Sequence, residues 1–201
     1  MSESPSTRHS LLVEIRDLHN EAAWSQFIDA YAPLVYRYAR RQGLQDADAA
    51  DLTQDVLRSI VRAAGQFVYD PTKGRFRTWL YTVTRNKVIN YLAAQKHVAQ
   101  AGADTCAWEQ INSVPDPSAN DSAEWERDYE RRMFDWACER VKNQFRDASW
   151  QAFWQTAVEG KPAAEVAAKL AMTVGAVYIA RSRVLAAIKG EVERLVGEEE
   201  V

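Results

Sequence analysis

Residues 162–189, near the C-terminus, read PAAEVAAKLAMTVGAVYIARSRVLAAIK. Its apolar residues recur at spacings of three and four, which predicts two helices joined by a turn of three or four residues. Pro162 sits where first-turn prolines are favoured. At about 100° per residue, Val177, Val184 and Ile188 share one face of the second helix and should be buried. This layout is typical of a helix-turn-helix, whose second helix can enter the major groove of DNA.

The opposite face of that second helix carries Ile179, Ser182, Arg183 and Ala186. Such a face can contact DNA, but a helical hairpin without a ligand predicts the same pattern. This stretch alone leaves both interpretations open.

The helical period continues through the rest of the chain, and no segment alternates as a half-buried strand does. Pro33 should kink or restart its helix, because proline has no backbone donor. The predicted helices cover residues 11–18, 21–42, 46–64, 78–96, 122–145, 147–158, 162–171 and 173–196. Residues 97–121, rich in Ala, Asp, Ser and Pro, lack a sustained period. The prediction is therefore all-α, with helical domains at 8–96 and 122–197 joined by a flexible acidic linker at 97–121.

The composition limits the class of protein. Of 201 residues, 47% are apolar and 26% charged, which is typical of a globular chain with a core. No apolar run approaches the roughly 18 residues of a membrane span, and MSESPSTRHS lacks the apolar stretch of a signal peptide. We expect a cytoplasmic protein without a membrane partner. Cys106 and Cys138 are too few for a disulfide framework and are expected to be reduced thiols.

Charge is unevenly divided along the chain, although the net charge is only -3. Residues 1–96 contain 13 basic residues (Lys and Arg) and 10 acidic residues (Asp and Glu). Residues 97–128 contain 1 basic and 7 acidic residues, and residues 129–201 contain 11 of each. Between Asp70 and Lys96 there are six basic residues and one acidic residue. This local basic patch indicates a focused contact with a polyanion.

Residues that could carry catalysis are scattered. The three histidines are His9, His19 and His97. None of them lies near a nucleophile or a set of metal ligands in the sequence. The eight glycines are isolated and form no phosphate-binding loop. Acidic pairs such as Asp51 with Asp55 are typical of a solvated helix face. We expect no enzyme activity, no metal and no cofactor.

The loop at 66–77 and the helix after it interleave aromatic with basic residues, as in Tyr69, Lys73, Arg75, Phe76, Arg77 and Trp79. This composition suits stacking on unpaired bases while phosphates are neutralised. On the helix, one broad apolar arc is formed by Leu80, Thr84, Val88, Tyr91 and Leu92. The other side carries Trp79, Thr82, Asn86 and Asn90. Asn can donate to and accept from a base edge. Alternatively, Trp79 packs on the preceding helix and the asparagines are only solvated.

Three segments together resemble the extracytoplasmic-function (ECF) sigma factors of bacterial RNA polymerase: DLTQDVLRSIVRA (51–63), GRFRTWLYTVTRNKVINYL (74–92) and EVAAKLAMTVGAVYIARSRVLAAIK (165–189). The resemblance implies a non-enzymatic subunit that binds core RNA polymerase, directs transcription initiation at specific promoters and melts the minus-ten element. In many relatives an anti-sigma factor holds the protein inactive.

The resemblance also implies roles for particular residues. Those that would bind the clamp of the largest polymerase subunit are Asp51, Gln54, Asp55 and Leu57. Those that would bind the minus-ten element, partly as single-stranded DNA, are Tyr69, Lys73, Arg75, Phe76, Arg77, Trp79, Asn86, Lys87 and Asn90. Those that would read the double-stranded minus-thirty-five element are Thr173, Tyr178, Ile179, Ser182 and Arg183. Many relatives carry basic residues where this chain has Tyr178, Ile179 and Ala180.

Two further expectations concern the second domain and the linker. Trp150, Phe153 and Trp154 lie near the surface that would meet the flap of the second polymerase subunit, or they belong to the core. The acidic linker would repel nucleic acid in the free protein and mimic it in a basic channel, through Asp104, Glu109, Asp116, Asp121 and Glu124.

Two rival functions differ in what they explain. A stand-alone helix-turn-helix regulator explains the second domain but gives the aromatic and basic loop no role. A small helical hydrolase using Cys138 or an acidic pair explains neither.

Overall fold

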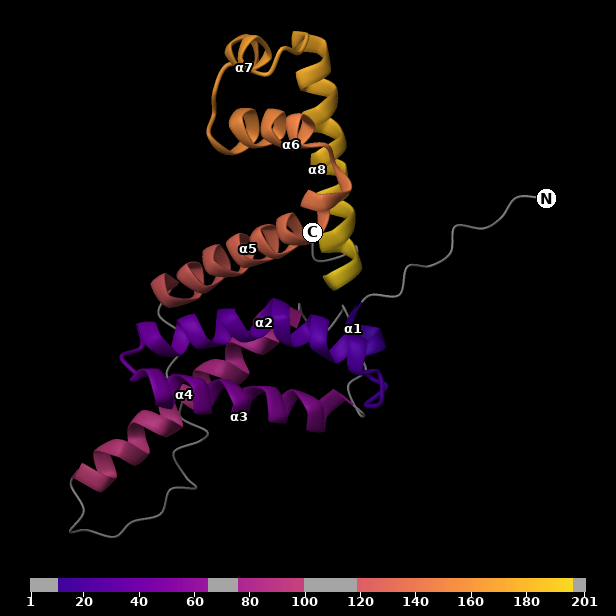
Figure 1. The fold of residues 1–201 in the computed structure, drawn as a ribbon. Coiled ribbons are helices and arrows are strands. Elements are labelled where there is room, and N and C mark those ends of the chain that lie inside the picture. Colours follow the sequence, from indigo (N-terminus) through magenta and orange to yellow (C-terminus); the bar gives the residue numbers. More distant parts are fainter. Residues whose placement is uncertain (1–10, 65–75, 100–118, 197–201) are drawn as a thin grey trace. The chain divides into compact units, whose positions relative to one another are not determined.

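The computed structural model describes residues 11–64, 76–99 and 119–196, and all regular structure within these ranges is helical (Figure 1). The prediction of an all-α fold is confirmed. The chain folds into two compact units, one spanning Leu12–Arg132 and the other Met133–Val201 with Met1–Leu11.

The first unit is built on α2 (Glu21–Arg41), α3 (Asp46–Ala64) and α4 (Phe76–Ala99), each of which packs on the other two. A short α1 (Leu11–Glu14) precedes them, and α5 (Ala119–Val141) contributes its residues up to Arg132. The Asn20 side chain accepts a hydrogen bond from the Ala23 amide at 3.1 Å, which caps α2. Gly43, at φ +91°, follows the end of α2 in a conformation that favours glycine.

Aromatic rings form the centre of the first unit. Phe27 and Tyr31 lie one turn apart on α2, and the Phe76 ring centroid lies 5.9 Å and 5.3 Å from theirs. On α4, Leu80, Thr84 and Val88 are buried, which confirms the predicted apolar arc at these positions, whereas Tyr91 and Leu92 are half-buried.

Pro33 does not restart the helix, because α2 runs without a break from Glu21 to Arg41. A proline at this position leaves the carbonyl four residues earlier, that of Asp29, without its helical donor. The Arg132 guanidinium on α5 donates to this carbonyl through Nη2, and to the Ala30 carbonyl through Nε at 3.2 Å. An external donor thus satisfies the acceptor that the proline leaves open.

The second unit contains the rest of α5, then η3 (Lys142–Gln144), α6 (Asp147–Phe153), η4 (Trp154–Val158), α7 (Ala163–Lys169) and α8 (Val174–Val196). Here α8 packs on α6 and α7. The predicted inner face of α8 is confirmed, because Val177, Val184 and Ile188 are buried. Trp150 and Phe153 are also buried, so these two belong to the core.

Some predicted boundaries are wrong. The helix expected from Thr78 begins at Phe76, and the predicted helix at 147–158 continues as a π-helical turn from Trp154. Residues 119–121, which the composition places in the linker, lie in α5. The division of domains at 97–121 remains a prediction.

No described helix is by itself long and apolar enough to cross a membrane. The pair α7 and α8 passes the same criteria of length and hydropathy only when taken together, with a bend of 102° between them.

The turn between α7 and α8 holds Ala171 at φ +52°, a left-handed conformation that costs an L-residue about 1–2 kcal/mol. We expect Ala171→Gly to stabilise the second unit by up to about 1 kcal/mol after the greater chain entropy of glycine is subtracted. Thermal unfolding followed by circular dichroism measures this change.

The matched control is Ala168→Gly, an exposed position inside α7. Glycine there should destabilise by about 1 kcal/mol, because it lowers helix propensity. Destabilisation of similar size by both substitutions would contradict the strain at Ala171.

Candidate nucleic-acid and polymerase interfaces

The predicted polymerase-binding residues share an exposed face of α3. Asp51, Gln54 and Asp55 are exposed, and Leu57 is half-buried. Arg58, which the sequence pattern does not single out, donates to Asp55 Oδ1 at 2.7 Å and to Gln54 Oε1 at 3.2 Å. Exposed pairs of this kind contribute about 0–1 kcal/mol, so a partner can displace Arg58 at little cost.

The residues predicted to bind the minus-ten element lie in three different environments. Tyr69, Lys73 and Arg75 fall outside the described residues. Phe76 is 2% exposed and packs in the aromatic core. Its contact with DNA stays a prediction, and it would require the ring to leave this core.

Arg77 turns toward α5. Its Nε lies 3.1 Å from Glu126 Oε2 without the alignment of a hydrogen bond, and its guanidinium carbon lies 5.8 Å from the centroid of the Tyr129 ring. The side chain is only 14% exposed. In this arrangement a carboxylate holds the position beside Arg77 that a phosphate would need.

The rest of the predicted face of α4 reaches solvent. Trp79 is half-buried, with its ring 5.5 Å from that of Phe76, one turn earlier. Asn86 and Lys87 are half-buried and Asn90 is exposed. Positions 79, 86 and 90 recur on one side of the helix, so an aromatic ring and two amides lie along one accessible stripe.

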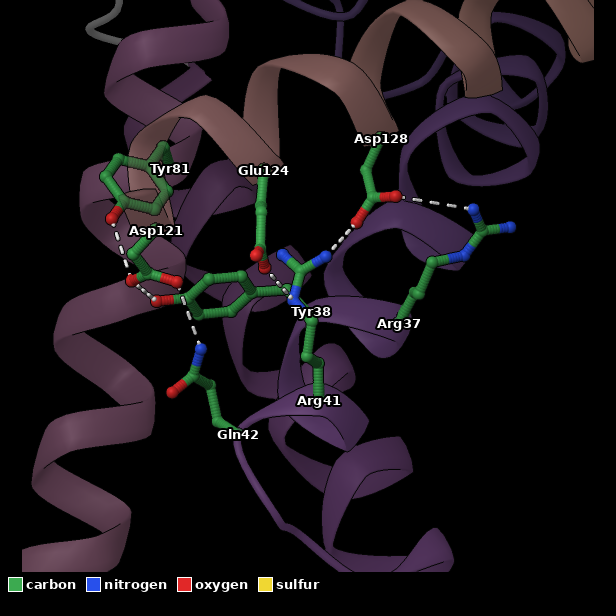
Figure 2. A network of polar contacts seen from close by, with 8 residues as sticks. All are labelled: Arg37, Tyr38, Arg41, Gln42, Tyr81, Asp121, Glu124 and Asp128. Atoms are coloured by element: carbon green, nitrogen blue, oxygen red, sulfur yellow. Dashed lines mark hydrogen bonds and ion pairs between the residues drawn. The ribbon is translucent and has the colours of Figure 1, made fainter. Parts of the chain in front are cut away.

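A partly buried polar network joins α5 to α2 and α4 (Figure 2). Asp121 Oδ2 accepts from the Tyr38 hydroxyl at 2.9 Å and from the Tyr81 hydroxyl at 3.0 Å, and Oδ1 accepts from Gln42 at 3.2 Å. Burial, reinforced by these hydrogen bonds, raises the pKa of both phenols above the ordinary value. Both tyrosines therefore stay protonated and donate at neutral pH.

Ion pairs continue the network along α5. Arg41 pairs with Asp128 and, at 3.5 Å, with Glu124, while Arg37 lies 3.6 Å from Asp128 (Figure 2). Asp121, which the composition places at the end of the linker, lies in α5 and accepts hydrogen bonds from α2 and α4. Glu124 lies in α5, as the predicted helix at 122–145 implies, and pairs with Arg41 on α2. Asp104, Glu109 and Asp116 fall outside the described residues.

The outer face of α8 exposes apolar side chains among polar ones. Ile179 is 62% and Tyr178 56% exposed, and Ser182 and Arg183 are also exposed. Thr173 Oγ1 accepts from the Ala176 amide at 3.1 Å and so caps the helix.

A groove of about 500 Å³ borders this face, lined by residues that include Phe145, Arg146, Met172, Ile179 and Arg183. The sequence pattern does not point to Arg146, because this residue precedes α6 and lies far from α8 in the chain. Two arginines thus flank one side of the exposed face of α8.

The described residues hold no cluster of His, Cys, Asp and Glu that could bind a metal ion. Burial raises the pKa of the Cys138 thiol to about 11. A thiol with this pKa is protonated at neutral pH and is a poor nucleophile.

Comparisons with known proteins give one family-model match and two curated relatives. Residues 27–98 match the family model of sigma-70 region 2. The ECF RNA polymerase sigma factor RpoE of Cereibacter sphaeroides is 30% identical over 83 residues, which are 41% of this chain and 45% of that protein. BldN of Streptomyces coelicolor, also an ECF RNA polymerase sigma factor, is 32% identical over 96 residues, 47% of this chain and 35% of its own. The matches thus span less than half of either relative.

A solved structure of CnrH in complex with the cytosolic domain of CnrY is 20% identical and covers 94% of this chain and 98% of its own. Its TM-score of 0.33 is too low to establish a shared arrangement.

Residues 27–98, which lie within α2, α3 and α4 and the segments that join them, are therefore similar to sigma-70 region 2. Within that class, the predicted resemblance to ECF sigma factors is confirmed.

The burial of Phe76 predicts a structural effect. Phe76→Ala should lower the free energy of unfolding by about 3–5 kcal/mol, the usual cost of deleting a buried phenyl ring. Urea denaturation followed by circular dichroism measures the loss. Asn90→Ala, an exposed change on the same helix, should alter stability by less than about 0.5 kcal/mol. A Phe76→Ala protein as stable as Asn90→Ala would contradict the core assignment.

Proposed function

We propose that the chain is a promoter-specificity subunit that binds core RNA polymerase in the cytoplasm, recognises two promoter elements and melts the downstream one. The observation that carries the proposal is the sigma-70 region 2 match over residues 27–98, where α4 exposes an aromatic and amide stripe. Run-off transcription tests it: core polymerase mixed with the protein should transcribe from a promoter library. A lone regulator would instead shift duplex DNA without polymerase.

The exposed face of α3 is the proposed contact with the polymerase clamp. Gln54 offers an amide beside the carboxylate of Asp55, and a basic partner can take over the hydrogen bonds that Arg58 now makes. Charge complementarity of this kind favours the correct partner and accelerates association.

Gln54→Ala should weaken binding to core polymerase about three- to tenfold, the effect of losing one interfacial hydrogen bond. Fluorescence anisotropy of labelled protein titrated with core polymerase measures the affinity. Gln45→Ala makes the same chemical change at an exposed position outside this face and should leave affinity unchanged. Equal affinity of the two variants would remove Gln54 from the contact.

The stripe at Trp79, Asn86 and Asn90 is the proposed site for unpaired bases of the minus-ten element. Extruding a base costs a few kcal/mol, and stacking on an aromatic ring returns roughly 1–3 kcal/mol per base. Trp79 would supply the stacking surface, while the amides would select base edges. Melting by this route needs no ATP.

Trp79→Ala combined with Asn86→Ala should reduce promoter opening while closed complexes still form, because duplex binding does not need the stripe. Permanganate reactivity of unpaired thymines measures opening, and a mobility shift measures closed complexes. If reactivity matches that of the unaltered protein, the stripe does not hold the open strand.

The outer face of α8 is the proposed reader of the upstream element. Exposed Tyr178 and Ile179 suit apolar contact with thymine methyl groups, which lie in the major groove. Because the first turns of a recognition helix contact bases, Arg183, lying further along α8 beside the groove with Arg146, would contact a phosphate.

Arg183→Ala should therefore weaken binding to all upstream sequences alike and reduce the slope of log affinity against log salt by about one. Titrations at several salt concentrations with two unrelated upstream sequences measure both quantities. A loss confined to one sequence would show that Arg183 reads a base instead.

A further inference from the structure

Residues 119–132 of α5, called the docked segment below, lie on a surface built from α2 and α4. Trp125 and Tyr129, four residues apart, are 1% and 3% exposed. The Trp125 ring lies 5.5 Å from Tyr38 and 5.4 Å from Tyr81. The segment thus buries an aromatic face on the part of the chain that is similar to sigma-70 region 2.

The surface on α2 contains an acceptor that suits an external donor. Pro33 leaves the Asp29 carbonyl without a helical donor, and Arg132 reaches this carbonyl as well as that of Ala30. This part of the α2 surface therefore recognises an arginine at the right distance from Trp125, because a guanidinium has enough N–H donors to bind both carbonyls.

The acidic side of the docked segment meets basic residues. Glu126 lies beside Arg77, and Glu124 and Asp128 lie beside Arg41. These carboxylates neutralise guanidinium groups that could otherwise bind phosphates. Because Arg77 is only 14% exposed, it cannot serve a carboxylate and a nucleic acid at once.

The docking leaves some hydrogen-bonding capacity unused. Among the described residues, the buried indole N–H of Trp125 has no acceptor, and Arg77 Nε has no aligned hydrogen bond. Undocking would return both donors to water, which offsets part of the apolar contact that is lost. The docked segment is thus packed in a way that allows another ligand to replace it on this surface.

We propose that the docked segment is an internal competitor of single-stranded DNA: it occupies the α2 and α4 surface through Trp125, Tyr129 and Arg132, and it must leave Arg77 before DNA can bind there. The choice of DNA as the competing ligand rests on the proposed function. The segment would thereby weaken DNA binding by the free protein.

The test uses the full chain and a fluorescently labelled random 12-nucleotide single-stranded DNA, with affinity measured by anisotropy. Glu126→Gln frees Arg77, and Glu130→Gln removes the same charge from an exposed position of the same helix. Arg132→Ala removes the contact with α2, and Arg127→Ala removes the same charge from an exposed position.

Glu126→Gln and Arg132→Ala should each bind DNA about three- to tenfold more tightly than the matched control, because a larger fraction of the protein is open. The rise for Arg132→Ala is diagnostic, since loss of a positive charge alone weakens binding to DNA. Amide hydrogen exchange of residues 119–132 should be faster in these two variants, and faster in the unaltered protein when DNA is added.

Other results would overturn the inference. If each variant binds like its control, or if residues 119–132 stay protected when DNA binds, the segment does not compete, and run-off transcription can still support the proposed function. If neither DNA binding nor run-off transcription occurs, the proposed function fails and the inference fails with it.

Discussion

The packing of Phe76 against Phe27 and Tyr31 is the constraint on which the rest of the first unit depends. Because this ring is enclosed by α2, the first turn of α4 cannot rotate without opening the aromatic core. The next residues then have fixed directions, with Arg77 toward Glu126 and Trp79 toward an accessible edge. The candidate DNA surface owes its geometry to the core beneath it, as a preorganised binding site requires.

The acidic segment shows why net charge alone is a poor guide to behaviour. Residues 97–128 carry seven acidic side chains and one basic side chain, a composition typical of a solvated tether. Yet Asp121 is held between two phenols, and Asp128 pairs with Arg37 and Arg41. Carboxylates that find donors on a neighbouring helix become part of the packed structure. The same charges thus stabilise a contact instead of repelling one.

Periodicity predicts the helices and several buried faces because both depend on residues close in sequence. Val177, Val184 and Ile188 on α8, and Leu80, Thr84 and Val88 on α4, are buried as expected. The sequence does not predict the burial of Phe76, because an aromatic residue beside basic residues has the same composition in a DNA-binding loop and at the edge of a core. A helical spacing does relate Trp125 and Tyr129 to Asp121 and Arg132, but the spacing does not predict which helices these residues contact.

The all-α class, the amphipathic faces and the ECF sigma factor resemblance are predictable from the amino-acid sequence, because they follow from local spacing and from motifs of adjacent residues. The packed helices add what spacing does not predict: Arg77 faces a carboxylate, Arg132 satisfies the carbonyl left open by Pro33, and Asp121 belongs to a partly buried network. Each of these contacts joins residues about 40 to 100 positions apart. Their meeting depends on how the helices pack, which no local pattern encodes.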